Sequence, residues 1–139
     1  MKIFFLGDIV GKSGRSTVIK NLKDILKKKK IDFVVVNGEN AADQGVGITE
    51  AISNDLLNSG VDVITTGNHV WDQKETASYI ETEARLLRPL NLPENSPGKG
   101  FGIYTSKKGF KIGVLNLMGN IFMKKCDDVF IAASNFLKK

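Results

Sequence analysis

The chain has 139 residues, of which 42% are hydrophobic and 25% charged, as expected for one soluble globular domain over residues 1–139. Its single histidine and single cysteine exclude a disulfide framework, a zinc finger, an iron–sulfur cluster and any metal site held by several imidazoles of this chain alone. The net charge of +5 is compatible with an acidic partner, but the lysines at 27–30, at the end of a predicted helix, and at 138–139 are expected to complement the helix dipole and stay solvated. No aromatic residues alternate with them, as a surface that binds single strands would need.

Up to residue 83, apolar strands alternate with amphipathic helices. The patterns predict strands at 2–6, 32–37 and 61–65. Helices are predicted at 13–29, at 49–59 with Thr49 as cap and Gly60 as stop, and from an Asp72 cap to about Glu83. Each parallel connection needs a crossover, so this alternation predicts an α/β fold with a mostly parallel sheet that is covered on both faces.

The pattern changes after Arg88 and Pro89. Residues 91–100 are rich in Pro, Gly and Asn and predict a surface loop, and residues 101–105 and 111–117 predict a strand pair. A final helix is predicted to begin near Asp127 or Asp128 and to reach Leu137. We expect one open strand edge and the apolar face of this helix to lack partners.

No segment predicts a membrane span or an export signal. The apolar run from Ile3 to Leu6 is interrupted by Gly7 and Asp8, and it is too short for a signal-peptide core or a transmembrane helix. We therefore expect a cytoplasmic protein without a membrane partner, in keeping with the lone Cys126.

Polar side chains follow three successive predicted strands: Asp8, then Glu39 and Asn40, then Asn68 and His69. Parallel strands end at one edge of their sheet, where ligands bind in such folds, so these groups are expected to converge. Taken singly, each has a simpler interpretation: Asp8 as a helix cap, Asn40 as a turn residue, His69 as a satisfied, partly buried histidine. Together they predict an oxygen-rich site that suits Mg, Mn or Fe better than structural zinc.

A metal site would give each of these residues a role. Asp8 and Glu39 would be anionic ligands, with Glu39 able to bridge two cations, while Asn40 and Asn68 would add neutral carbonyl oxygens. His69 would serve better as a proton donor to a leaving oxygen than as a metal ligand, because imidazole titrates near neutral pH. Two cations about 3.5–4 Å apart would hold both oxygens of an in-line displacement at phosphorus.

The segment from Gly7 to Ser13 also resembles a phosphate-binding P-loop between a strand and a helix. A P-loop needs four residues between its glycines, whereas Gly7 and Gly11 enclose three, so the anion nest would be one residue short. A weaker role stays open, in which Gly11 to Gly14 help to hold a substrate phosphate at the helix N-terminus.

Several motifs in order resemble the YmdB-like branch of the calcineurin-like metallophosphoesterases: GDIVGKSGR at 7–15, NGENAA at 37–42, TTGNHVWD at 65–72, LLRP at 86–89 and NLMG at 116–119. The resemblance implies a sheet sandwich flanked by helices, with phosphodiesterase activity on 2′,3′-cyclic nucleotides and two divalent metals, Fe or Mn. It implies that Asp8 ligates the first metal, that Glu39 bridges both, that Asn40 and Asn68 ligate the second, and that His69 is the proton donor.

Members of that branch are about twice as long as this chain and use three further metal-ligating histidines, for which a chain with one histidine has no counterpart. We therefore expect the N-terminal half of such an enzyme, from a truncated or split reading frame. Hydrolysis of cyclic nucleotides or related phosphoesters is expected to need a separately encoded C-terminal half. The alternative is a non-catalytic phosphate- or nucleotide-binding module, and homo-oligomerisation stays open.

Overall fold

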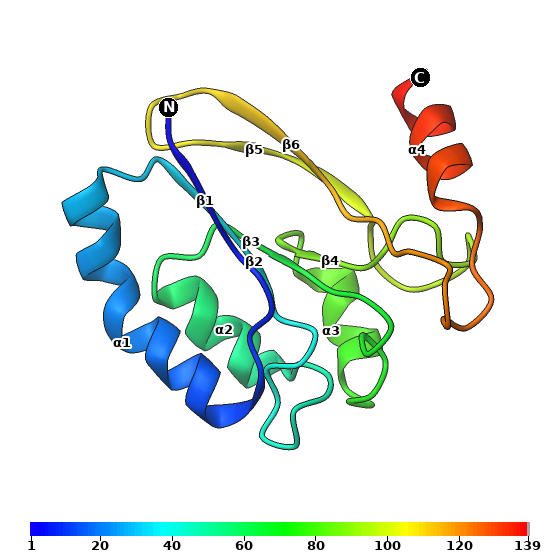
Figure 1. Cartoon of the computed structure of the whole chain (residues 1–139), viewed down its shortest axis with the longest axis horizontal. Coiled ribbons are helices and arrows are strands. Elements are labelled where there is room, and N and C mark those ends of the chain that lie inside the picture. Colours follow the sequence, from blue (N-terminus) through cyan, green and yellow to red (C-terminus); the bar gives the residue numbers. More distant parts are fainter. Residues whose placement is uncertain (139) are drawn as a thin grey trace.

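A parallel sheet of four strands, in the order β1-β2-β3-β4, forms the centre of the fold (Figure 1). The structure is a computed structural model that describes residues 1–138. Its elements in chain order are β1 (Ile3–Leu6), α1 (Gly11–Lys29), β2 (Phe33–Asn37), α2 (Glu50–Asn58), β3 (Val63–Thr65), α3 (Thr76–Thr82), β4 (Leu86–Leu87), β5 (Phe101–Thr105), β6 (Lys111–Leu115) and α4 (Val129–Leu137).

Helices α1, α2 and α3 lie on the same face of this sheet (Figure 1). Each strand pairs with the next one along the chain, and right-handed crossovers between such neighbours all return on one side. Val34 and Val36 of β2 are buried in the main core on this side, together with Leu22 of α1 and Leu56 of α2. The predicted α/β fold is therefore confirmed, with helices on one face.

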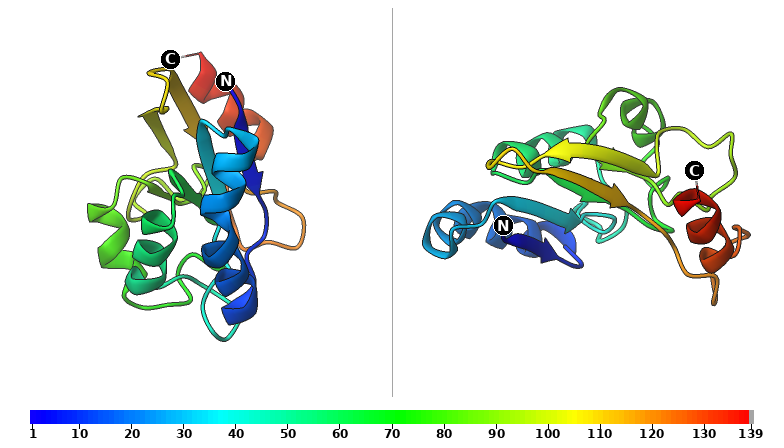
Figure 2. Two further views of the ribbon diagram at one scale, coloured as in Figure 1. Left: turned by 90° about the vertical axis from the view of Figure 1, so that its left-hand side faces the viewer. Right: turned by 90° about the horizontal axis from the view of Figure 1, so that it is seen from above.

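The antiparallel pair β5–β6 covers the opposite face of the sheet, so the second layer is itself made of strands. Phe33 and Val35 of β2 point to this side and pack with Ile112 in a second, smaller core. Because β2 is covered on both faces, its apolar residues form a continuous run instead of alternating with polar ones. Figure 2 (left) shows the hairpin and α4 at the end of the molecule away from α2 and α3.

Several elements differ from the predictions made from sequence, and β3 and β6 are each two residues shorter than predicted. Helix α1 begins at Gly11, two residues before the predicted start, and the two-residue strand β4 was not predicted because it is too short for any periodicity. Helix α3 begins at Thr76 after the N-cap residue Glu75, so Asp72 does not cap it. Residues 69–75 instead form turns that are closed by backbone hydrogen bonds such as Thr76 N to Gln73 O.

The predicted surface loop at 91–100 has a buried beginning. Asn91 is only 1% exposed, and its Nδ2 donates to the carbonyl oxygens of Met118 and Asp127, while its Oδ1 accepts from Met118 N. A polar side chain buried in this way is stable only when its hydrogen bonds are satisfied. Asn91 thereby fixes the segment that follows β6.

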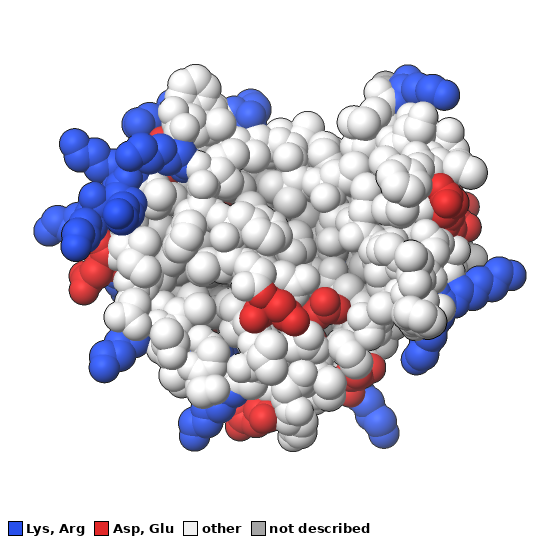
Figure 3. Space-filling view, viewed as in Figure 1, with Lys and Arg blue, Asp and Glu red and all other residues white. Residues whose placement is uncertain are grey.

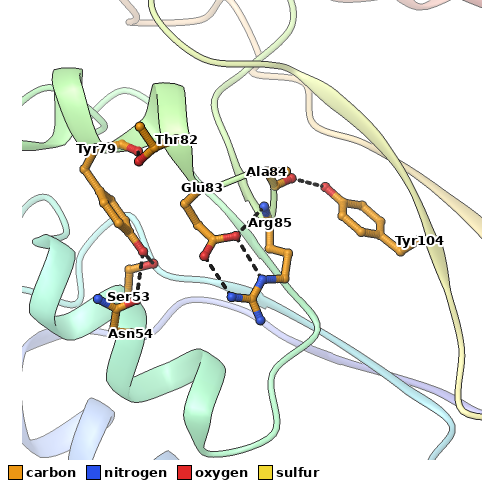
Figure 4. Close-up of polar contacts among 8 residues, drawn as sticks. All are labelled: Ser53, Asn54, Tyr79, Thr82, Glu83, Ala84, Arg85 and Tyr104. Atoms are coloured by element: carbon orange, nitrogen blue, oxygen red, sulfur yellow. Dashed lines mark hydrogen bonds and ion pairs between the residues drawn. The ribbon is translucent and has the colours of Figure 1, made fainter.

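Polar contacts tie the hairpin layer to the segment between α3 and β4 (Figure 4). The Tyr104 hydroxyl of β5 donates to the Ala84 carbonyl at 2.7 Å, and burial raises the pKa of Tyr104 to about 12, so the hydroxyl stays a neutral donor. Next to Ala84, Arg85 Nε and Nη2 donate to the two oxygens of Glu83 at 2.9 and 2.8 Å. The Tyr104–Ala84 bond ties the hairpin to this segment, and the Arg85–Glu83 pair fixes the segment itself.

None of the helices in the described part of the chain combines the length and the apolar character needed to cross a membrane.

Candidate metal centre

The site predicted from sequence forms where β1, β2 and β3 end side by side. Backbone bonds continue beyond the strands: Ile9 N donates to Asn37 O at 3.0 Å, and Gly11 N donates to Asn40 O at 2.8 Å. Gly38 N likewise donates to Thr65 O at 3.0 Å. The three loops that carry the polar residues are therefore held in register with one another at the carboxyl edge of the sheet.

Asp8 and Asn40 form one pair at this edge. Asn40 Nδ2 donates to Asp8 Oδ2 at 2.8 Å, which connects the loop after β1 with the loop after β2. The other amide atom, Asn40 Oδ1, is buried and finds no hydrogen-bond partner among residues 1–138. A buried carbonyl oxygen without a partner is costly, and coordination of a cation would satisfy it.

Glu39 is held between the second and third strands. Its backbone N donates to Asn37 Oδ1 at 3.1 Å, and its Oε2 accepts from the backbone N of His69 at 3.5 Å. Its carboxylate lies directly over Gly67, where an added Cβ would come within 2.7 Å of Glu39 Cδ and still closer to Oε2. The carboxylate therefore occupies this position only because residue 67 has no side chain.

His69 points its Nδ1 at Asp72. The distance from Nδ1 to Asp72 Oδ2 is 2.6 Å, and the two side chains are 34% and 36% exposed. A carboxylate only accepts hydrogen bonds, so this contact keeps the proton on Nδ1 of a neutral ring and leaves Nε2 as the nitrogen directed elsewhere. Asp72, which was predicted to be a helix cap, is the residue that orients the imidazole.

This geometry predicts the tautomer of the ring. In neutral His69 we expect Nδ1 to carry the proton. Asp72→Asn should shift the population toward the tautomer protonated at Nε2, because the amide can present its NH₂ group to Nδ1 whereas a carboxylate can only accept. Long-range ¹⁵N–¹H correlation spectra measure this directly, since the chain has one histidine. The exposed Asp24→Asn on α1 is the control, and an unchanged tautomer in Asp72→Asn would contradict the assignment.

A cavity of about 390 Å³ opens beside these groups. Glu39 and Asn68 line it together with Asn37, and Ile121 and Met123 add apolar side chains to the lining. Asp8, Asn40 and His69 are not among the lining residues. His69 contacts the lining Glu39 through its backbone N, whereas Asp8 and Asn40 are bonded to each other. The structure therefore brings the predicted residues to one edge of the sheet in two groups. Asp8 lies with Asn40, and Glu39 lies with Asn68 and His69.

The donor atoms suit a hard divalent cation. Asp8, Glu39, Asn40 and Asn68 offer carboxylate and amide oxygens, which Mg, Mn and Fe accept, and the unpartnered Asn40 Oδ1 fits a coordinating role. Within residues 1–138, however, no three His, Cys, Asp or Glu side chains gather closely enough to hold a metal on their own. These residues fit a cation but make up only part of a coordination sphere.

The P-loop alternative gains no support from the loop around Gly11. Helix α1 begins there, and Gly11 has a φ of 61°. Arg15 does not extend toward an open anion site, because its Nη1 and Nη2 donate to Ala41 O and to Asp43 Oδ1. Arg15 therefore secures the loop after Asn40.

Charge is distributed unevenly over the face shown in Figure 3. Acidic atoms lie both near its centre and at its edges, whereas the Lys and Arg side chains lie at its periphery and gather over the end of α1 and the turn of the hairpin. Lys27, Lys28 and Lys29 are exposed in the last turn of α1, where they complement the helix dipole. Part of the basic excess of the chain is thus accounted for by the end of α1.

Three residues of this site were missed by the sequence analysis: Asn37, Gly67 and Asn116. Asn116 follows β6, and its Nδ2 donates to the carbonyl oxygens of Thr66 and Leu87 at 2.8 and 3.0 Å, which fixes the start of the loop that carries Asn68. The sequence does show an asparagine at the end of two apolar strands, Asn37 and Asn116. The spacing of residues along the chain does not indicate which backbone groups these side chains bind.

A family model described as YmdB-like protein matches residues 4–139. The 2′,3′-cyclic-nucleotide 2′-phosphodiesterase of Bacillus subtilis (strain 168) is 43% identical over 137 residues, which are 99% of this chain and 51% of that protein. A putative phosphatase/phosphodiesterase of Mycoplasma genitalium is 36% identical over 123 residues, or 86% of this chain and 43% of that protein. The chain thus spans about half the length of these relatives.

Two crystal structures share the fold. One is a hypothetical protein from Thermus thermophilus, with a TM-score of 0.90 and 38% identity, matched by 100% of this chain and 53% of its own. The other is described as a novel phosphatase from Mycoplasma pneumoniae, with a TM-score of 0.89 and 34% identity, matched by 100% of this chain and 51% of its own. The sheet sandwich described above is thus the arrangement found in part of these longer proteins.

Proposed function

The chain belongs to the YmdB-like protein family, and from this membership we propose that its site hydrolyses phosphoesters of the cyclic-nucleotide class with two divalent cations, Fe or Mn. The observation that carries the proposal is the buried, unpartnered Asn40 Oδ1 beside Asp8, on the sheet edge that also holds Glu39 and Asn68. The name of the Bacillus subtilis relative supports the choice of substrate.

Each residue has a distinct task in this proposal. Asp8, Glu39, Asn40 and Asn68 hold the cations, with Glu39 between the loops that follow β2 and β3. When bound, the cations polarise the phosphoester and activate the attacking water. With both ring nitrogens protonated, His69 donates the Nε2 proton to the leaving oxygen and becomes the neutral ring, whose remaining Nδ1 proton is held by Asp72.

The proposal includes a requirement for further donors. Two cations with five or six ligands each need about eight to ten donor positions, some of them from water. The four residues of this chain do not fill them, and the relatives are about twice as long. We therefore propose that turnover needs the polypeptide that corresponds to the other half of those relatives.

The test is hydrolysis of bis-p-nitrophenyl phosphate and 2′,3′-cyclic AMP with Mn²⁺ or Fe²⁺. The chain is assayed alone and co-expressed with the half of the Bacillus subtilis relative that it does not match. We expect turnover only with both halves, and a loss of about 100-fold or more in Glu39→Gln, because a carboxylate that would hold the cations becomes a neutral amide.

Glu94→Gln, a change of the same chemistry in an exposed loop, is the matched control and should be neutral. Full activity of Glu39→Gln would contradict the site. Robust turnover by the isolated chain that is lost in Glu39→Gln would confirm the site and contradict the need for the other half.

A non-catalytic phosphate- or nucleotide-binding module is the second candidate. It is favoured by one observation: in residues 1–138 no three His, Cys, Asp or Glu side chains form a metal-binding group. This candidate predicts that binding of 2′,3′-cyclic AMP is the same with and without EDTA, whereas the phosphodiesterase proposal predicts that EDTA weakens it. Titration calorimetry in the two buffers separates them.

A further inference from the structure

The segment between β6 and α4, orange in Figure 1, forms a loop at the side of the molecule. Its two ends are tied together, because Asn91 Nδ2 donates both to Met118 O at 2.7 Å and to Asp127 O at 2.9 Å. Asn120 Nδ2 adds a second bond to Asp127 O at 3.0 Å. Since both ends are fixed, the residues between them are held in one region of the surface.

The tip of this loop presents apolar side chains to solvent. Ile121 is 77% exposed, Phe122 is fully exposed, and Met123 is 39% exposed. Three successive exposed apolar side chains are unfavourable in water, and contact with an apolar part of a ligand would remove them from it. The loop therefore holds apolar surface in a fixed place where the chain itself does not bury it.

Two of these three side chains belong to the cavity of the candidate metal centre. Ile121 and Met123 line the cavity of about 390 Å³ that Glu39 and Asn68 also line, whereas Phe122 does not. Sites for small molecules have volumes of this order and combine apolar walls with a few polar groups. A ligand that reaches the cation donors with a charged group thus has apolar protein surface within the same cavity.

The polar side chains of the lining already have partners or tasks. Asn37 Oδ1 accepts from Glu39 N at 3.1 Å, and Asn116 Nδ2 donates to two backbone carbonyls at 2.8 and 3.0 Å. Thr66 Oγ1 donates to a backbone carbonyl at 2.9 Å. Glu39 and Asn68 are the proposed cation ligands. The apolar side chains are therefore the part of the lining that is available to the uncharged part of a ligand.

We propose that Ile121 and Met123 form the subsite for the base of a cyclic nucleotide whose phosphate lies at the cation donors. Both side chains contact the face of the base, and the Met123 thioether makes favourable contacts with aromatic rings. Every base has such a face, so the subsite accepts all four bases. Because the substrate class comes from the proposed function, the assignment of this subsite rests on that function.

Other occupants fit this part of the cavity less well. A free cation or inorganic phosphate has no apolar part and would leave Ile121 and Met123 in water. An apolar segment of another polypeptide would cover the same side chains, and the base would then have no access to them. With that occupant, replacement of the two side chains would leave the affinity for the base unchanged.

The test compares a substrate that has a base with one that has none. 2′,3′-Cyclic AMP and glycerol 1,2-cyclic phosphate share a five-membered cyclic phosphodiester, and only the first carries a base. Both are assayed with the chain co-expressed with the unmatched half of the Bacillus subtilis relative. In the double variant Ile121→Ser/Met123→Ser, we expect KM for 2′,3′-cyclic AMP to rise about tenfold with kcat unchanged, because the contact is equally strong in the ground state and the transition state. KM for the glycerol substrate should not change.

Ile103→Ser is the matched control, since Ile103 is 65% exposed on β5 and does not line the cavity. It should leave KM unchanged for both substrates. The four 2′,3′-cyclic nucleotides should have kcat/KM values within about fivefold of one another. An unchanged KM for 2′,3′-cyclic AMP in the double variant, an equal rise for both substrates, or a preference of about 100-fold or more for one base would each overturn the subsite.

Methyl spectra of the chain separate the subsite from the proposed hydrolysis. In EDTA, 2′,3′-cyclic AMP at millimolar concentration should move the Ile121 δ1 and Met123 ε methyl signals upfield through the ring current of the base, and should leave the Ile103 signal in place. These shifts without turnover by the complex would support the subsite and contradict the hydrolysis. Turnover that is lost in Glu39→Gln, without these shifts and with unchanged KM in the double variant, would support the hydrolysis and overturn the subsite.

Discussion

Gly67→Ala is expected to weaken Mn²⁺ binding about 100-fold or more, as much as the removal of Glu39 itself. The alanine methyl group would occupy the space of the Glu39 carboxylate, within 2.7 Å of Cδ. Gly67 is buried two residues after β3, and the nearest atoms in the way belong to the end of the Glu39 side chain, so Glu39 leaves its position between the loops after β2 and β3. Titration calorimetry with MnCl₂, on the chain and on its co-expressed complex, measures the effect.

Gly119→Ala is the matched control for this change. Gly119 lines the same cavity, but an added Cβ there meets no atom within 4 Å, so binding should stay within about twofold of wild type. Urea unfolding of both variants distinguishes local displacement of Glu39 from loss of the fold. Unchanged Mn²⁺ affinity in Gly67→Ala would show that the position of Glu39 over Gly67 does not matter for cation binding.

Gly100→Ala is expected to lower the free energy of unfolding by about 3 kcal/mol. An added Cβ would lie 2.7 Å from the backbone N of Leu90 and closer still to its Cα, and backbone atoms cannot rotate away as the end of a side chain can. The Gly100 carbonyl accepts from Asn116 N at 2.9 Å, and Leu90 N donates to Asn116 O at 2.8 Å. The strain therefore reaches the residue that fixes the loop of Asn68.

Gly14→Ala in helix α1 is the control, and it is expected to raise the free energy of unfolding. Its Cβ would be 3.7 Å from Ile9 Cγ2, an ordinary contact, and alanine in a helix is favoured over glycine by about 0.5–1 kcal/mol. Urea denaturation of the three proteins should rank them with Gly14→Ala as the most stable and Gly100→Ala as the least stable. A Gly100→Ala variant as stable as wild type would mean that the segments around Leu90 separate readily.

Most of the regular elements were predictable from the sequence because they depend on local pattern. The apolar run of β2 and the helical spacing in α1 and α2 arise from burial on one or both faces, and burial imposes those periods. The Thr49 cap, whose Oγ1 accepts from Ile52 N, and the Asp128 cap are equally local. Strand β4, with two residues, lies below the length at which a period is defined.

The sequence by itself determined the family resemblance and the order of the strands and helices apart from β4. It also determined which residues are expected at the carboxyl edge of the sheet, because parallel strands with crossovers end on one side. Only the tertiary structure decided how those residues are held. Gly67 matters because a carboxylate from another strand lies over it, and Asn40 Oδ1 because the fold buries it without a partner. Contacts between loops about thirty residues apart depend on how the strands align, and sequence spacing does not encode that alignment.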